Sequence, residues 1–290
     1  MSVTIVYTIA TLSIIGSSAA VILYFAARRF KVNEDPRIDQ VEEALPGANC
    51  GGCGFAGCRA FAEACVNNGD LAGLYCPVGG DEVMNLVAGI LGLEAVKKDP
   101  RKAYIRCNGI SVYREKSSAY DGVKTCAIAS MVYTGETDCQ WGCLGYGDCY
   151  DACKFDAVEL RPDLGVPLIN DDNCVACGAC VEACPRDLIE LRKKFPKDRK
   201  VVVACRNQDK GAVAMKACMV ACIGCGKCMK ECKFDAITIK NNLAFIDSDK
   251  CKLCRKCVSV CPTGAILELN FPQRKIRKED KEECNTAKTN

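Results

Sequence analysis

A repeated arrangement of cysteines in the second half of this chain limits the folds open to it more than any other pattern. Three sets keep the spacing C-x2-C-x2-C-x3-C, beginning at Cys174, Cys222 and Cys251, and one irregular set precedes them. Of the 290 residues, 26 are cysteine, which is far above the content of an ordinary globular domain. Cysteine chemistry therefore organises the fold, through disulfides, structural zinc or iron-sulfur clusters.

The cysteine spacing favours iron-sulfur clusters over zinc. A structural zinc site takes two cysteine pairs well apart, whereas each regular set here crowds three cysteines within seven residues. Two sets end in Cys-Pro, at Cys184 and Cys261, and match the bacterial ferredoxin run, whose fourth cysteine ligates the partner cluster. The chain has no histidine, which removes Rieske-type centres and the commonest nitrogen ligand for zinc.

An internal repeat indicates that the four sets form two modules. Residues 153–157 (CKFDA) recur as residues 232–236, and 189–191 (IEL) have a counterpart in 267–269 (LEL). The repeated unit is about 77 to 79 residues long. Each unit is predicted to be a two-cluster ferredoxin module, with short strands near residues 157–160 and 236–239.

Crossed ligation then assigns four cysteines to each of four clusters. Module one is predicted to use Cys139, Cys143, Cys149 and Cys184 for one cluster, and Cys174, Cys177, Cys180 and Cys153 for the other. Module two is predicted to use Cys222, Cys225, Cys228 and Cys261, and Cys251, Cys254, Cys257 and Cys232. The first set is irregular, with three and then five residues between its cysteines, so its loop is expected to bulge around the cluster.

A fifth cluster is predicted near the N-terminus. Cys50, Cys53 and Cys58 lie in a glycine-rich loop, and Cys76 precedes a proline after a helix-length excursion. Residues 59–68 are predicted to be helical, with Cys65 as a core residue. The loop also contains a G-x-G-x-x-G string, but no strand precedes it, so a dinucleotide site is rejected.

The first 27 residues carry no charge and are long enough to span a bilayer as one helix. Arg28, Arg29 and Lys31 follow at once, so the positive-inside rule predicts a single-pass protein of the inner (cytoplasmic) membrane with its iron-sulfur domains in the cytoplasm. A cleaved signal peptide would need its positive charges before the apolar run. A cytoplasm keeps thiols reduced, which disfavours a disulfide framework.

Six cysteines remain unassigned, and burial is the default for free cysteine. They are Cys65, Cys107, Cys126, Cys205, Cys218 and Cys284. Cys107 and Cys126 flank a stretch with glycine and tyrosine between the two cluster regions, where a sixth metal site or a redox pair stays open. Trp141 and the tyrosines are interpreted as packing residues. The net charge of +3 is scattered, so no nucleic-acid partner is expected, and no catalytic constellation is present.

The predicted fold class is α+β, with one N-terminal transmembrane helix, a small helical 4Fe-4S domain and two bacterial-ferredoxin-like modules. The expected divisions are an anchor (residues 1–31), an N-terminal 4Fe-4S domain (32–90), a connecting region (91–135), module one (136–195), module two (196–270) and a charged, disordered tail (271–290).

The chain resembles the B subunit of the Rnf electron-transport complex. The resemblance is carried by the apolar N-terminal helix, ALPGANCGGCGFAGC with a later Cys-Pro, QWGCLGYGDCYDACKFDA and CVACGACVEACPRDLIEL, and it covers nearly the whole chain. Many members of that family carry one ferredoxin module, and the additional sets from Cys222 to Cys261 are similar to the longer forms found in anaerobes.

This resemblance implies a subunit of an ion-translocating ferredoxin:NAD+ oxidoreductase. Such a complex oxidises reduced ferredoxin, reduces NAD on another subunit and couples the transfer to Na+ or H+ export. The chain would carry five 4Fe-4S clusters, with soluble ferredoxin as donor and other membrane subunits as partners. Two alternatives stay open: the electron-wiring subunit of a membrane hydrogenase or CO-oxidising complex, and an iron-sulfur scaffold or redox sensor.

Overall fold

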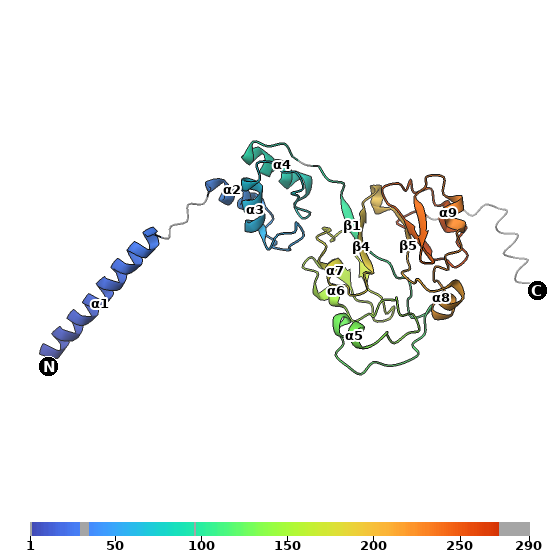
Figure 1. Ribbon diagram of the computed structural model, residues 1–290, viewed down its shortest axis with the longest axis horizontal. Coiled ribbons are helices and arrows are strands. Elements are labelled where there is room, and N and C mark those ends of the chain that lie inside the picture. The colour runs from blue at the N-terminus through green and yellow to red at the C-terminus, as the bar shows by residue number, and fades with distance from the viewer. Residues whose placement is uncertain (1, 30–34, 96, 273–290) are drawn as a thin grey trace, which may run out of the picture.

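The computed structural model describes residues 2–29, 35–95 and 97–272 (Figure 1). Helix α1 (Ser2–Arg29) stands apart at one end, and the cysteine-containing parts of the chain lie beyond it. Its segment Val6–Ala26 has a mean hydropathy of 1.9 and is not buried against the rest of the protein, so by length and composition it can cross a membrane. The tail from residue 273, predicted to be disordered, and Cys284 lie outside the described residues.

The N-terminal domain (residues 35–95) is a three-helix unit. It consists of α2 (Pro36–Ala44), α3 (Cys58–Asn67) and α4 (Gly80–Leu91). Helix α2 begins at Pro36, because the Asp35 side chain accepts a 2.9 Å hydrogen bond from the Arg37 amide and Pro36 suits the first helical position. Phe61, Met84 and Cys65 are buried in its core, so the prediction for Cys65 is confirmed.

Module one (residues 97–195) pairs its first strand with its last. Its elements are β1 (Arg101–Ile105), α5 (Cys126–Val132), α6 (Asp148–Asp151), β2 (Val158–Glu159), β3 (Leu168–Ile169), α7 (Ala179–Glu182) and β4 (Ile189–Lys193). Strand β1 is antiparallel to β4, with Ile105 opposite Ile189, and β2 is antiparallel to β3. The region expected to be a connection thus supplies an edge of this module.

Module two (residues 196–272) repeats the same pairing. Its elements are the 3-10 turn η1 (Pro196–Asp198), β5 (Lys200–Val203), α8 (Gly211–Ala217), α9 (Lys227–Glu231), β6 (Ile237–Lys240), β7 (Leu243–Ile246), α10 (Lys256–Ser259) and β8 (Ile266–Leu269). Strand β5 pairs with β8, with Val203 opposite Ile266, and β6 pairs with β7. The strands expected near residues 157–160 and 236–239 are confirmed as β2 and β6.

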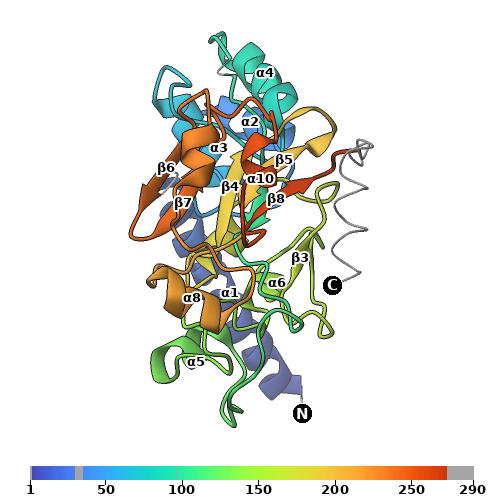
Figure 2. The same ribbon diagram turned by 90° about the vertical axis from the view of Figure 1, so that its right-hand side faces the viewer.

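The two modules pack against each other (Figure 2). Phe245 of module two has the guanidinium groups of Arg106 and Arg192 of module one 5.3 and 5.4 Å from its ring centroid. Arg192 also donates a 2.7 Å hydrogen bond to the Ile246 carbonyl, and Tyr104 packs against Val202. Both arginines are buried, and cation–π and charge-assisted contacts of this kind fix the relative orientation of the modules. The α+β fold class is confirmed.

Candidate metal centres

Four separate pockets are each lined by four cysteines. The pocket of the N-terminal domain has Cys50, Cys53, Cys58 and Cys76; those of module one have Cys153, Cys174, Cys177 and Cys180, and Cys126, Cys143, Cys149 and Cys184; that of module two has Cys222, Cys225, Cys228 and Cys261. Three of these sets coincide with predicted ligand sets. In each module, a cysteine from one run meets cysteines from the other, which is the crossed arrangement of two-cluster ferredoxins.

The fifth predicted set, Cys232, Cys251, Cys254 and Cys257, also comes together in module two. Burial raises the pKa of the Cys257 thiol to about 12, and the neighbouring charges of Cys251, Cys254 and Cys232 contribute to the rise. Cys254 is exposed and Cys257 is buried, so one side of this set faces solvent.

Backbone amides point at the cysteine sulfurs, as a cluster-binding thiolate requires. The amides of Gly79, Ala157 and Leu188 each lie 3.4 Å from a sulfur, respectively Cys76, Cys153 and Cys184, and the Ala244 amide lies 3.5 Å from Cys222. Among the described residues, no three cysteine or carboxylate side chains gather closely enough for a single metal ion. These donor sets therefore fit cubane clusters rather than mononuclear zinc.

The irregular first set differs from its prediction. The pocket that holds Cys143, Cys149 and Cys184 is completed by Cys126, and Cys139 does not line it. Cys139 instead receives the Asn207 side-chain amide, with 3.7 Å between nitrogen and sulfur.

The internal repeat explains this difference. When Cys153 is aligned with Cys232, Cys143 and Cys149 align with Cys222 and Cys228, and Tyr146 stands where module two has Cys225. The first run is therefore a regular ferredoxin run that lacks its second cysteine, and Cys126 from a distant segment fills the gap. The repeat alone could have shown that the second cysteine of this run is missing, but it could not have shown that Cys126 takes its place.

Helix α5 carries Cys126 into this pocket and is held by Asp148. The Asp148 carboxylate accepts hydrogen bonds from the Cys126 amide at 2.6 Å and the Ala127 amide at 2.9 Å, while the Thr125 hydroxyl caps Ile128 at 3.3 Å. A carboxylate at a helix N-terminus satisfies otherwise unpaired amides and interacts favourably with the helix dipole. Asp148 thus positions Cys126 from the short helix α6, which also carries Cys149.

Replacing Asp148 by alanine is expected to make the module-one site containing Cys126 labile, because the helix-capping interaction it removes contributes about 1–2 kcal/mol. The measurement is the rate of iron loss to a chelator under anaerobic conditions. Asp151→Ala, which removes an exposed carboxylate from the same short helix, is the matched control. Equal iron loss from the two variants would contradict this role of Asp148.

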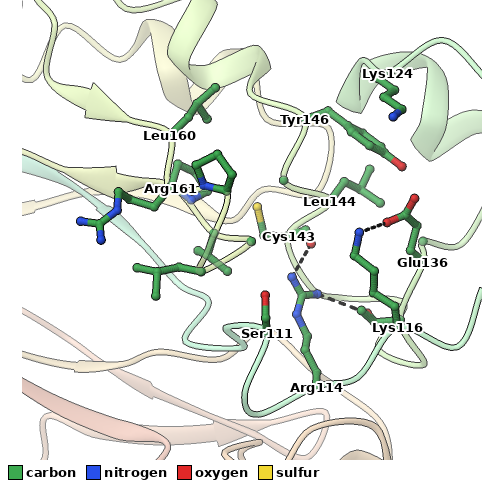
Figure 3. A pocket seen from close by; sticks show the side chains of 18 of the residues that line it. Ser111, Arg114, Lys116, Lys124, Glu136, Cys143, Leu144, Tyr146, Leu160 and Arg161 are labelled. Carbon is green, nitrogen blue, oxygen red and sulfur yellow. Dashed lines mark hydrogen bonds and ion pairs between the residues drawn. The ribbon is translucent and has the colours of Figure 1, made fainter. Parts of the chain in front are cut away.

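A basic cavity of about 300 Å³ adjoins Cys143 (Figure 3). Arg114 crosses it, donating to the Cys143 carbonyl at 2.7 Å and to the Thr137 hydroxyl at 3.3 Å, and its Nε donates to the Gly109 carbonyl. Arg114 thereby ties the segment after β1 to the irregular cysteine loop.

Comparison with known families assigns the metal chemistry. A putative Fe-S cluster family matches residues 45–73, a 4Fe-4S binding domain matches residues 167–190, and a 4Fe-4S dicluster domain matches residues 221–265. The three matches cover the N-terminal loop, the second run of module one and both runs of module two. The chain therefore carries 4Fe-4S binding sequences in both modules and a putative Fe-S sequence in the N-terminal domain.

Curated relatives cover nearly the full length of the chain. It is 42% identical to the B subunit of the ion-translocating oxidoreductase complex of Methanosarcina acetivorans, over 92% of this chain and 99% of the relative. It is 43% identical to the B subunit of the Na(+)-translocating ferredoxin:NAD(+) oxidoreductase complex of Acetobacterium woodii, over 90% of this chain and 77% of that protein. The chain belongs to the B-subunit family of Rnf ion-translocating oxidoreductase complexes. The corresponding protein of Clostridium ljungdahlii, 41% identical over 91% of this chain and 92% of the relative, is part of a complex named as proton-translocating.

Membership of this family confirms the predicted resemblance and accounts for α1. The B subunit is a membrane-anchored part of a multi-subunit redox complex, and its apolar helix is the segment able to provide the anchor.

Proposed function

We propose that this B subunit accepts electrons from a reduced ferredoxin and passes them, one at a time, to partner subunits of an ion-translocating ferredoxin:NAD+ oxidoreductase. Five of its 4Fe-4S sites follow from the cysteine runs, and one of the five takes Cys126 in place of Cys139. When bound, each cluster supplies a one-electron redox couple. The protein supplies the thiolates, the N–H···S hydrogen bonds and the separations between sites.

The observation that carries this proposal is that neighbouring sites adjoin. A Cβ on Gly52, in the N-terminal cluster loop, would lie only 2.6 Å from the Cys177 carbonyl oxygen of module one. The Lys154 ammonium bridges the same junction, 3.1 Å from the Asn49 carbonyl. The N-terminal site therefore abuts one site of module one across a direct backbone contact.

Within each module, the two sites are also neighbours. Burial raises the pKa of the Cys180 thiol to about 12, and thiolate charges including that of Cys149, a ligand of the other site, contribute. In module two, the charge of Cys228, a ligand of one site, likewise contributes to the raised pKa of Cys257, a ligand of the other. A scaffold that delivers clusters to other proteins has no need of such a contiguous series.

Module two is the favoured place for ferredoxin to dock. Cys225 and Cys254 are its exposed predicted ligands, and exposed lysines lie within eight residues of them in the sequence. These are Lys227, Lys230, Lys233, Lys250, Lys252 and Lys256. A donor whose cubanes each carry a charge of roughly -2 with their thiolates is attracted to such a surface.

The basic residues Arg28 and Arg29 at the end of α1 support a cytoplasmic location for all the iron-sulfur domains. In inverted membrane vesicles, an added protease should digest these domains. Digestion only in right-side-out vesicles would contradict this orientation.

Mixing the anaerobically purified protein with reduced ferredoxin tests the function. Rapid reduction of several clusters, followed by optical and EPR spectroscopy, is expected. A potentiometric titration in which no cluster has a reduction potential that ferredoxin can reach would contradict the proposal. Efficient transfer of whole clusters to apo-acceptor proteins would instead favour the scaffold alternative.

Reversing two charges at the proposed docking surface is expected to slow reduction by ferredoxin. Lys227→Glu with Lys252→Glu should lower the second-order rate constant for reduction by ferredoxin about 10- to 100-fold at low ionic strength. Added salt should reduce the difference in this rate constant between the variant and the parent protein. Stopped-flow spectroscopy measures both effects. Lys97→Glu together with Lys98→Glu, in the stretch that follows the N-terminal domain, makes the same change in net charge. Equal slowing by both pairs would exclude a specific surface on module two.

A further inference from the structure

Three unassigned thiols and the displaced Cys139 occupy one part of the fold. Cys126 completes a module-one site and Cys65 lies in the N-terminal core, so among the described residues Cys107, Cys205, Cys218 and Cys139 are left without a site. Cys139, Cys205 and Cys218 are buried and Cys107 is half-buried. Two of the four come from each module, so they belong to the junction between the modules.

These four cysteines form two symmetry-related pairs in the internal repeat. Cys107 follows the last residue of β1 by two positions, and Cys205 follows the last residue of β5 by two positions. Ile105 and Val203 occupy equivalent registers, because they pair with Ile189 and Ile266, each five residues after the final cysteine of its module.

The second pair has the same property. Cys139 and Cys218 each stand four residues before the first cysteine of the ferredoxin run, Cys143 in module one and Cys222 in module two. Each module therefore presents one cysteine after its first strand and one before its first run.

Hydrogen bonds hold the segments that carry these thiols together. The Asn108 amide donates to the Ala204 carbonyl at 3.0 Å, which places the residues next to Cys107 and Cys205 side by side. The Met219 amide donates to the Tyr113 carbonyl at 3.0 Å, which joins Cys218 to the chain that follows Cys107. Arg114 extends this connection to the loop after Cys139 through the Cys143 carbonyl (Figure 3).

Asn207 links two of the sulfurs directly. It is 1% exposed, its backbone amide lies 3.4 Å from the Cys205 sulfur, and its side-chain nitrogen lies 3.7 Å from the Cys139 sulfur. The Cys222 amide gives the Cys205 sulfur a second donor at 3.3 Å. Cys205 thus has the N–H···S surroundings of the ligands described above.

The electrostatic coupling among the thiols agrees with this geometry. Burial raises the pKa of the Cys218 thiol, and the charges of Cys107 and Cys139 add to the rise. Burial raises the pKa of the Cys205 thiol to about 12, with Cys107 again among the charges that contribute. The pKa of Cys139 is raised by burial and then by Cys107. Burial is thus the main cause in each case, and Cys107 is a contributing charge in all three.

We propose that Cys107, Cys139, Cys205 and Cys218 hold a sixth 4Fe-4S cluster between the two ferredoxin modules. Such a site would take four thiolates from four segments, and N–H donors are already in place at Cys139 and Cys205. A disulfide would use two of the thiols and leave the other two unexplained, and a mononuclear ion would need a closer gathering than these residues provide.

The position of this site joins the two halves of the electron path. On one side, Cys205 touches the amide of Cys222, a ligand of module two. On the other side, Cys107 packs against the same core cluster of module one as Cys143, a ligand of that module. An electron from module two would first reduce this sixth cluster. The sixth cluster would then pass the electron to a cluster of module one. That relay role rests on the proposed function, whereas binding of the cluster does not.

Metal content of the full chain tests the site independently of any activity. The anaerobically reconstituted protein should contain about 24 iron atoms and as many sulfides, instead of about 20 for five clusters. Cys107→Ala, Cys139→Ala, Cys205→Ala and Cys218→Ala should each lower the content by about four irons or leave a three-iron centre with its own EPR signal. Cys65→Ala removes a buried thiol that belongs to no site and should leave the iron content unchanged.

Double variants show which cysteines share a site. Cys139→Ala with Cys218→Ala should lose no more iron than either change alone, whereas Cys139→Ala with Cys126→Ala should lose two clusters. An iron content of about 20, stoichiometric zinc, or a Cys205→Ala variant that folds and keeps all its iron would overturn the proposal. If iron binding follows these expectations but ferredoxin reduces no cluster, the sixth site stands and the proposed function fails.

Discussion

Stripping iron from the anaerobically purified protein with a chelator is expected to unfold both ferredoxin modules while the N-terminal domain keeps much of its helical structure. Module one has helices of four to seven residues and strands of two to five, and module two is built alike. Elements this short are marginal on their own. Cysteines form a large part of the module cores, alongside small residues such as Ala103 and Ala265.

The expected effect is large because structural metal sites contribute on the order of 10 kcal/mol of binding free energy to folding. That is comparable with the whole stability of a small domain. The N-terminal domain differs, since Phe61, Met84, Leu71 and Val87 give it an apolar core and its helices run to 12 residues. Limited proteolysis with mapping of the cuts, and near-UV circular dichroism, measure the two parts separately. Apo-modules that resist protease as well as the holo-protein would show that the clusters do not hold the fold.

The regular parts of this fold were predictable because cluster ligation is local. A C-x2-C-x2-C-x3-C run fixes a loop around one metal cluster, and the repeat from residue 153 to residue 232 fixes the number of modules. The start of module one was missed for a physical reason. Strand β1 is five residues long and pairs with a strand beginning at Ile189, and no local pattern marks so distant a partner.

The same distinction applies to the cysteine sites. Where three closely spaced cysteines form a compact loop and a later or partner run supplies the fourth, three pockets agree with the predicted sets. Cys126 was missed because it reaches its pocket from a separate helix, held by Asp148, and no motif surrounds it. Cys205 and Cys218 were interpreted as buried thiols, because most free cysteines in proteins are buried. The equivalence of Cys205 with Cys107 can be recognised only when the structure shows that β1 and β5 are equivalent strands.

Gly52→Ala is expected to open the junction between the N-terminal domain and module one without removing a cluster. The added methyl would lie 2.6 Å from the Cys177 carbonyl oxygen and 2.8 Å from its Cα, and both are backbone atoms that cannot turn aside. Overpacking of this kind costs about 1–3 kcal/mol. The separation should slow electron transfer between the N-terminal site and its neighbour, because the rate of tunnelling falls steeply with distance. Stopped-flow reduction by ferredoxin, resolved by the spectrum of each cluster, measures this step.

The control is Gly89→Ala, the same chemical change in helix α4 at an exposed position with nothing within 4 Å of the added carbon. It should leave electron transfer unchanged and favour the helix by roughly 0.5–1 kcal/mol. Hydrogen exchange at residues 49–58 and 174–180 should rise in Gly52→Ala alone. If Gly52→Ala keeps all its iron and transfers electrons to the N-terminal site at the parental rate, the contact with Cys177 is not the path, and electrons must leave module one elsewhere.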